Sequence, residues 1–332
     1  MSLVIPPPRI LIFRALPGLG DLLCAVPALR ALRRGAPEAE ITLVGLPQAA
    51  AFAGRFPDLI DQFLPFPGFP GLPEQPVKNA DLLGFLQQVQ GQYDLALQLH
   101  GAGTLTNPVV ALLGARQMAG RYVTGQWCPD PARFLPYRED EPEPLVWLRV
   151  VKHLGYPSQG ETLSFPVQGE DRAALRALPG VEALTPGRYA VLHPGASVPE
   201  RRWSPQKFAQ VGRELRGRGL QVVLTGTAGE AEATRAVREA LGPADLLDLT
   251  GQTDLGTLAA LLEGARLLVC GDTGVSHLGA ATRTPSVVVF LASDPARWAP
   301  LDRERHRVVG DDAGAALAEV DFLLRREVAR VG

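Results

Sequence analysis

A carboxylate follows a glycine-rich turn near the start of the chain, in the stretch PGLGD that ends at Asp21. The apolar residues before it, 10–13, predict a strand, and apolar residues recur at helical spacing over 22–34. A carboxylate in such a turn could accept the proton of a substrate hydroxyl. The alternative is that Asp21 only caps the helix, and this turn taken alone favours the cap.

The same turn is not a dinucleotide-binding fingerprint. That motif needs a third glycine, and Leu23 stands in its place. The second predicted strand, 40–45, ends in Val-Gly rather than at the acidic residue that would hold a ribose. The P-loop pattern of glycines before Lys and Ser or Thr is also missing from the sequence.

A turn of small residues and a pair of arginines follow the predicted strand 189–193. Backbone N–H groups in such a turn and guanidinium groups beside it can together bind a diphosphate. In isolation, a solvated pair of surface charges explains the arginines equally well. The candidate donor-binding residues in this stretch are Gly195, Ala196, Ser197, Arg201 and Arg202.

Another candidate turn follows the predicted strand 267–270 and opens the next helix. Thr273 and Gly274 would direct N–H groups at an anion bound at the N-terminus of that helix. His277, one turn later, could add a donor. Asp272 would repel a phosphate, so we expect it to orient nearby N–H groups or His277.

Four further residues complete the candidate set. Glu230 follows the predicted strand 221–225 and could accept hydrogen bonds from ribose hydroxyls, although a glutamate favoured by the helix dipole is an equal alternative. Candidates for binding an acceptor are Arg14, His100 and Arg121. The five histidines are scattered without ligand spacing, so we expect no metal site.

Strands alternate with helices in two blocks, which predicts an α/β protein of two doubly wound, Rossmann-like parallel domains facing each other across a cleft. We expect an N-terminal domain over 1–168, a donor-binding domain over 185–312, and a C-terminal helix over 313–332 that packs back towards the first domain. Prolines mark a linker between 165 and 187. The proline-rich stretch 63–76 predicts a loop packed on the body or, as the less favoured alternative, a lid with exposed aromatics.

Length and composition set the class of protein. A chain of 332 residues with 46% hydrophobic and 20% charged residues is typical of two globular domains. Its formal net charge of −2 excludes a broadly basic surface for nucleic acid. Three cysteines lie far apart, the apolar start lacks a basic leader region, and apolar runs stay short of a membrane span. We therefore expect a cytoplasmic protein.

Several motifs together resemble one enzyme family over nearly the whole chain, from about Arg9 to Pro300. The N-terminal signature reads RALPGLGDLL with VPALRALR, followed by YDLALQLHG and ARQMAGR. The second half carries LHPGAS, RRWSP, VVLTG, LTGQTDL and CGDTGVSHLGAA in order. These motifs resemble the family 9 glycosyltransferases, the ADP-heptose:lipopolysaccharide heptosyltransferases.

The resemblance implies a GT-B fold and inverting transfer without a bound metal or other cofactor. It implies a nucleotide-diphosphate sugar, ADP-heptose, as donor, and a cell-envelope glycan such as the lipopolysaccharide core as acceptor. If that acceptor is lipid-linked, we expect peripheral contact with the inner face of the membrane. By the same resemblance Asp21 is the general base, and Glu230 binds ribose.

The resemblance also assigns the diphosphate site. Asp272, Thr273, Gly274 and His277 match the family's donor-diphosphate turn. Arg201 occupies the place of a basic residue that is commonly lysine, which keeps the charge but changes the geometry of the contact.

Two alternatives remain open at the level of the sequence. A nucleotide-sugar epimerase of similar two-domain fold would turn over the donor with no acceptor present. A non-catalytic nucleotide-sugar-binding protein would keep every measurable property when Asp21 is replaced by asparagine.

Overall fold

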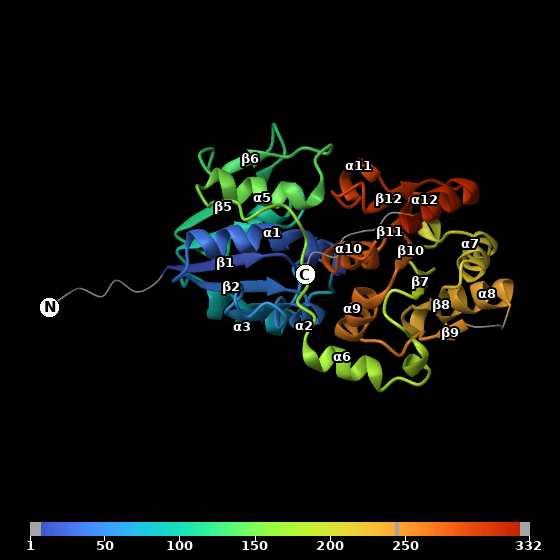
Figure 1. Ribbon diagram of the computed structural model, residues 1–332. Coiled ribbons are helices and arrows are strands. Elements are labelled where there is room, and N and C mark those ends of the chain that lie inside the picture. Colours follow the sequence, from blue (N-terminus) through green and yellow to red (C-terminus); the bar gives the residue numbers. More distant parts are fainter. Residues whose placement is uncertain (1–7, 243–245, 326–332) are drawn as a thin grey trace. The chain divides into compact units, whose positions relative to one another are not determined.

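The computed structural model describes residues 8–242 and 246–325. The chain divides into two compact units, Met1–Glu161 and Thr162–Gly332. Each unit is built on one parallel six-stranded sheet with helices on both faces (Figure 1). Among the described residues, none of the helices is long and apolar enough to cross a membrane.

The first sheet has the strand order β3-β2-β1-β4-β5-β6. Its strands are β1 Arg9–Phe13, β2 Glu40–Gly45, β3 Gln62–Pro65, β4 Leu95–Gln98, β5 Gln117–Tyr122 and β6 Phe134–Pro136. Its helices are α1 Leu19–Gly35, η1 Pro47–Ala49, α2 Ala50–Ala53, α3 Asn79–Val89, α4 Thr106–Ala111 and α5 Glu143–His153. Figure 1 shows α1 and α5 on one face of the sheet and α3 on the other.

The second sheet repeats this order as β12-β11-β10-β7-β8-β9. Its strands are β7 Tyr189–His193, β8 Gln221–Leu224, β9 Leu246–Asp248, β10 Leu267–Gly271, β11 Ser286–Val289 and β12 His306–Val309. The helices of this unit are α6 Gly169–Arg176, η2 Val181–Ala183, η3 Pro199–Arg201, α7 Pro205–Gly217, η4 Ala228–Glu230, α8 Ala231–Leu241, α9 Leu255–Gly264, α10 Gly274–Ala281, α11 Pro295–Trp298 and α12 Ala313–Arg325.

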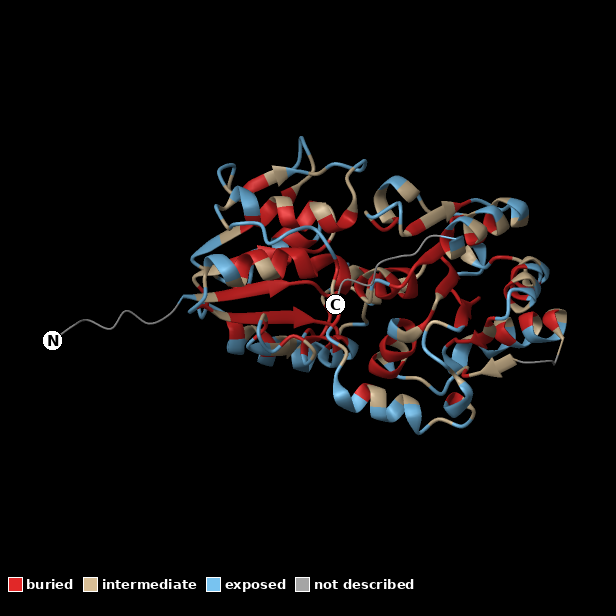
Figure 2. Cartoon of the chain, viewed as in Figure 1, coloured by how far each residue is buried: buried red, intermediate tan, exposed pale blue. Residues whose placement is uncertain are grey.

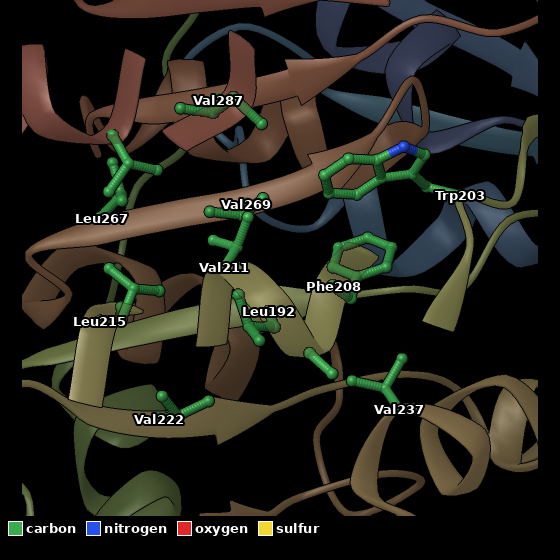
Figure 3. Packing of buried hydrophobic residues seen from close by; sticks show 14 of the residues in the cluster. Leu192, Trp203, Phe208, Val211, Leu215, Val222, Val237, Leu267, Val269 and Val287 are labelled. Carbon is green, nitrogen blue, oxygen red and sulfur yellow. The ribbon is translucent and has the colours of Figure 1, made fainter. Parts of the chain in front are cut away.

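The central strands of both sheets are buried, and the exposed residues lie mainly on the outer faces of the helices (Figure 2). In the second unit, alternate residues of β7, β8 and β10 form one buried cluster with residues of α7 and α8, and Figure 3 shows Leu192, Phe208 and Val269 among them. Burying a valine or leucine side chain of this kind stabilises a fold by roughly 1.5–3 kcal/mol. This apolar layer fixes where each strand ends, and therefore where the following turns lie.

The proline-rich stretch 63–76 packs on the first unit, so the less favoured lid with exposed aromatics is wrong. Phe66 is buried and lies edge-on to Phe13, with ring centroids 4.9 Å apart. It also meets Phe85 of α3 at 5.8 Å. Phe66 therefore extends the core of the first unit, and Phe69 packs against that core while partly buried.

One further expectation about the organisation needs correction, and a second stays a prediction. The expected linker 165–187 contains α6, which packs on α9 through Arg172, whose guanidinium donates to Glu263 at 2.8 Å and 2.9 Å. The described part of the final helix is α12, and its expected packing back towards the first domain stays a prediction. Its buried face, Val320 and Leu323 included, belongs to the core of the second unit, and residues 326–332 lie outside the described residues.

Candidate active site

Both sheets follow the doubly wound order in which the strand sequence reverses at one point. The reversal lies between β1 and β4 in the first unit, and between β7 and β10 in the second. Ligands of such folds bind outside the carboxyl ends of the strands at this point. The predicted turns follow these strands, so the strand order brings them together within each unit.

In the second unit, the turn after β7 lies against the carboxylate of Glu230, which follows β8. A Cβ atom added at Gly195 would lie only 2.2 Å from Cδ of Glu230. Glu230 Oε2 accepts hydrogen bonds from the backbone N–H and the hydroxyl of Thr227, at 2.7 Å and 2.9 Å. The glutamate therefore closes a capping box at the start of η4 and also faces the small-residue turn.

His193, the last residue of β7, lies behind this carboxylate. It is buried; its Nδ1 is 3.0 Å from Thr225 Oγ1, and its Nε2 is 3.9 Å from Glu230 Oε2. Burial lowers the pKa of His193, while the charge of Glu230 opposes that shift. His193 is not among the residues predicted for the site, although it lies directly before the turn.

Arg201 and the turn after β10 meet at the same edge. Arg201 Nη1 lies 3.8 Å from Oδ2 of the buried Asp272, and the same oxygen accepts a short hydrogen bond from the hydroxyl of Ser293. Asp272 therefore contacts an arginine and a serine hydroxyl, and its expected role in orienting nearby N–H groups or His277 stays a prediction. Sequence reasoning missed Ser293, which no motif marks.

The N-terminus of α10 follows immediately. Thr273 is its N-cap, and the hydroxyl of Thr273 accepts from Val275 N at 3.3 Å. The first N–H groups of a helix have no acceptors within that helix, so they can donate to an anion. His277 is buried in the next turn, with its ring 6.3 Å from that of Trp298.

The remaining donor candidates differ in exposure. Gly195 and Ala196 are buried, whereas Ser197 and Arg202 are exposed. Arg202 folds back, with its Nε donating to the carbonyl of Ala196 at 3.3 Å. It supports the turn, while Arg201 points to the start of α10.

In the first unit, Asp21 lies in the opening turn of α1, which begins at Leu19 rather than at 22. The N-cap of that helix is Gly18, so the interpretation of Asp21 as the N-cap is wrong. The carboxylate turns back over this glycine, because a Cβ atom there would lie 2.3 Å from Asp21 Oδ2. The Asp21 side chain is 23% exposed, which leaves part of it open to a substrate.

Arg14 directly follows β1 and connects Asp21 to the sheet. Its Nε donates to the backbone carbonyl of Asp21 at 2.7 Å, and its Nη1 makes a short hydrogen bond to the carbonyl of Leu99. Its Nη2 lies 3.8 Å from Asp21 Oδ1 and 3.6 Å from Oε1 of Glu143. The side chain of Arg14 is 1% exposed, so its contacts are with the protein itself.

His100, after β4, is also buried and committed to neighbouring groups. Its Nδ1 accepts from the N–H of Ala15 at 3.2 Å, which places the proton on Nε2, 3.0 Å from Oε1 of Glu74. Burial lowers the pKa of His100, and the charge of Glu74 opposes this shift. The contact between His100 and Glu74 connects the proline-rich stretch 63–76 to the end of β4.

Arg121 lies in β5 and is buried. Its guanidinium lies over the rings of Trp147 and Tyr137, at 4.3 Å and 4.8 Å from their centroids. Arg14 lies 4.8 Å from the same Trp147 ring, so one indole contacts two guanidinium groups. Direct binding of an acceptor by Arg14, His100 or Arg121 stays a prediction.

Sequence reasoning missed Glu74, Glu143 and Trp147 as parts of this arrangement. The stretch before α5 has the irregular composition of a loop, so Glu143 gives no signal as a site residue. The apolar spacing after it could have indicated a buried helix. Among the described residues, no group of three or more His, Cys, Asp or Glu side chains is arranged to hold a metal ion.

A family model described as "Glycosyltransferase family 9 (heptosyltransferase)" matches residues 146–320, just over half of the chain. The chain belongs to glycosyltransferase family 9. The matched region contains every turn of the second unit described above, so the family membership expected from the motifs is confirmed.

Individual proteins are similar to this family 9 chain in sequence and in fold. Lipopolysaccharide heptosyltransferase 2 of Escherichia coli K12 is 28% identical over 170 residues, which cover 50% of this chain and 44% of that protein. The match thus spans less than half of that relative's own length.

Solved structures match over nearly the whole chain. A family 9 glycosyl transferase from Veillonella parvula DSM 2008 has a TM-score of 0.76 at 20% identity, covering 98% of this chain and 99% of that one. The E. coli ADP-heptose lps heptosyltransferase II has a TM-score of 0.72 at 20% identity, covering 96% and 98%. These likenesses confirm the fold class expected from the sequence.

Proposed function

We propose that this family 9 chain is an inverting glycosyltransferase that moves a heptose from ADP-heptose to the core of a lipopolysaccharide. The family membership and the names of its relatives support the sugar and the acceptor. The observation that carries the proposal is the edge of the second sheet, where Arg201 and the N-terminus of α10 lie together beside Asp272. A cation and a helix N-terminus at one point favour a diphosphate.

In this proposal the second unit binds the donor. The N–H groups of Thr273 and Gly274 and the guanidinium of Arg201 hold the diphosphate and stabilise the charge that develops as it leaves. Gly195 and Ala196 allow close approach of the nucleotide, and Glu230 offers an oxygen to the ribose. The leaving group is neutralised by these residues, so the reaction requires no bound metal.

The first unit supplies the base. The acceptor hydroxyl loses its proton to the Asp21 carboxylate while its oxygen bonds to the anomeric carbon. The bond from that carbon to the diphosphate breaks on the opposite side, and ADP leaves with the electron pair. One displacement of this kind inverts the configuration at the anomeric carbon. An aspartate is ionised at neutral pH and is a weak base. It therefore accepts the proton in the transition state, where bonding to the anomeric carbon makes the acceptor hydroxyl more acidic.

The acceptor and the site of action follow from the same proposal. We propose that the protein acts in the cytoplasm, and that a lipid-linked core as acceptor brings it into peripheral contact with the inner face of the membrane.

The test replaces Asp21 by asparagine. Transfer from ADP-heptose to a heptose-free lipopolysaccharide core should fall by about 10²–10⁴-fold. The affinity for ADP should stay within a few-fold of the wild-type value. Asp21 lies in the first unit, whereas the donor turns, which follow β7, β8 and β10, lie in the second. Transfer rates and calorimetric titration with ADP measure the two effects. Asp81→Asn is the matched control, since Asp81 occupies the same first-turn position in α3 and is exposed.

Other outcomes identify the alternatives. Full transfer by the Asp21→Asn variant removes Asp21 as the base. Conversion of ADP-heptose with no acceptor present would indicate an epimerase, and ADP binding without any turnover would indicate a binding protein.

A further inference from the structure

A buried glutamate stands behind Arg14 and has no part in the proposed transfer. Glu143 is 2% exposed and opens α5. Its Oε1 accepts a hydrogen bond from Trp147 Nε1 at 3.0 Å and lies 3.6 Å from Arg14 Nη2. A carboxylate withdrawn this far from water is costly unless it is paired and hydrogen-bonded. The structure provides both contacts on one oxygen.

Arg14 connects this glutamate to the proposed base. Its Nε donates to the backbone carbonyl of Asp21 at 2.7 Å, and its Nη2 lies 3.8 Å from Oδ1 of the Asp21 carboxylate. The same Nη2 that approaches Asp21 Oδ1 also approaches Glu143 Oε1. The carboxylates of Asp21 and Glu143 therefore share one cation. Attraction to either carboxylate limits how closely Arg14 can approach the second one.

The balance of charge shows what Glu143 does for Asp21. Arg14 and Arg121 bring two positive charges to the Trp147 ring, and Asp21 and Glu143 bring two negative charges to Arg14. If Glu143 were neutral, its negative charge next to Arg14 would be lost while that of Asp21 remained. The guanidinium would then draw the Asp21 carboxylate inward and stabilise its charge, which makes it a weaker base.

We propose that Glu143 is a positioning residue, which holds Arg14 so that the Asp21 carboxylate faces the acceptor hydroxyl and keeps its basicity. This inference rests on the proposed function of Asp21. Trp147 takes part by fixing the glutamate through its indole N–H and by filling the space between the arginines.

The test is Glu143→Gln, which keeps the shape of the side chain and an oxygen for Trp147 but removes the charge. We expect kcat for transfer to a heptose-free lipopolysaccharide core to fall roughly 10- to 100-fold, because a misplaced catalytic group loses rate on this scale. The dissociation constant for ADP should stay within about twofold.

The pH profile separates positioning from a merely structural role. Among the described residues, the charged and titratable groups around Arg14 include Asp21, Glu143, Arg121 and His100, and the charge of Arg14 helps to lower the pKa of His100. With Glu143 neutralised, Arg14 acts on Asp21 without opposition. The acidic limb of the kcat profile should therefore move to lower pH, and a change in stability alone would not move it.

Asp171→Asn is the matched control. Asp171 is also a buried carboxylate in the first turn of a helix, where it closes the capping box of α6, but it lies in the second unit. The Asp171→Asn substitution should lower the melting temperature without changing kcat or its pH profile. Should Glu143→Gln not fold, Trp147→Phe keeps the ring and removes the hydrogen bond, and we expect a severalfold loss of kcat at unchanged ADP affinity.

A double variant distinguishes this inference from the proposed function. If Glu143 acts through Asp21, then Asp21→Asn combined with Glu143→Gln is no slower than Asp21→Asn alone. Two results overturn the inference while leaving Asp21 as the base: a wild-type kcat for Glu143→Gln, or equal slowing by Glu143→Gln in both backgrounds. Full activity of Asp21→Asn alone overturns the proposed function instead.

Discussion

The position of Glu230 depends on the absence of a side chain at Gly195. The carboxylate fills the space that any Cβ atom at 195 would need, at 2.2–2.6 Å from its three terminal atoms. Contacts this short force one partner to move. Since Glu230 is also fixed by Thr227, a larger residue at 195 would displace the turn, the glutamate, or both.

At this scale we predict that Gly195→Ala weakens ADP binding by about tenfold, or about 1.4 kcal/mol, because it disturbs both the turn and the proposed ribose ligand. Isothermal titration calorimetry with ADP measures the loss. Gly229→Ala is the control, since Gly229 lies in the next turn and its nearest atom to an added Cβ is Thr227 Oγ1 at 3.8 Å. Equal affinity of the two variants would contradict the assignment.

Individual strands also carry titratable groups that couple stability to pH. His306 of β12 pairs with Ser286 of β11, and its Nδ1 lies 2.8 Å from the serine hydroxyl. Burial lowers the pKa of His306 from 6.5 to about 4. Between these values the unfolded chain binds a proton that the folded chain does not, so stability is complete above about pH 6.5 and falls as the pH drops towards 4.

We therefore predict that His306→Asn reduces the loss of stability between pH 7 and pH 4.5. The histidine accounts for up to about 3 kcal/mol over the full range. Urea unfolding at several pH values measures the slope. Part of the slope should remain, because burial also lowers the pKa of His100 and His193. His153→Asn, at an exposed histidine, is the control, and an unchanged slope for His306→Asn would refute the prediction.

For the whole molecule, the two units divide the work of the proposed reaction. The donor turns lie in the unit Thr162–Gly332, and Asp21 with its supporting residues lies in Met1–Glu161. Binding of the nucleotide and deprotonation of the acceptor should therefore respond to separate substitutions.

We predict that ADP raises the melting temperature of the wild type and of Asp21→Asn equally, but raises that of Arg201→Ala much less. At a concentration 100 times its dissociation constant, a ligand stabilises by about 2.7 kcal/mol, which a thermal-shift measurement detects. Arg213→Ala is the control, because Arg213 of α7 donates to the carbonyl of Ala240, away from the donor turns. A wild-type shift for Arg201→Ala would remove this arginine from the donor site.

Local sequence determined much of the architecture. Strands 40–45 and 189–193 coincide with β2 and β7, because each is an apolar run bounded by clear turns. The edge strands β3, β9 and β12 went unpredicted because they are short and only partly buried, so their sequences lack the apolar pattern. The helix α6 was hidden by the prolines on either side of it.

The turns with glycine, aspartate and threonine could also be found from sequence, since these residue types and spacings are local properties of the chain. Which side chains stand behind them was decided only by tertiary structure. Glu143 is 122 residues beyond Asp21 in the sequence, yet the packing of α5 on α1 brings it to Arg14. Which buried charges pair over a long range depends on how helices and strands pack, so the spacing of residues along the chain does not predict it.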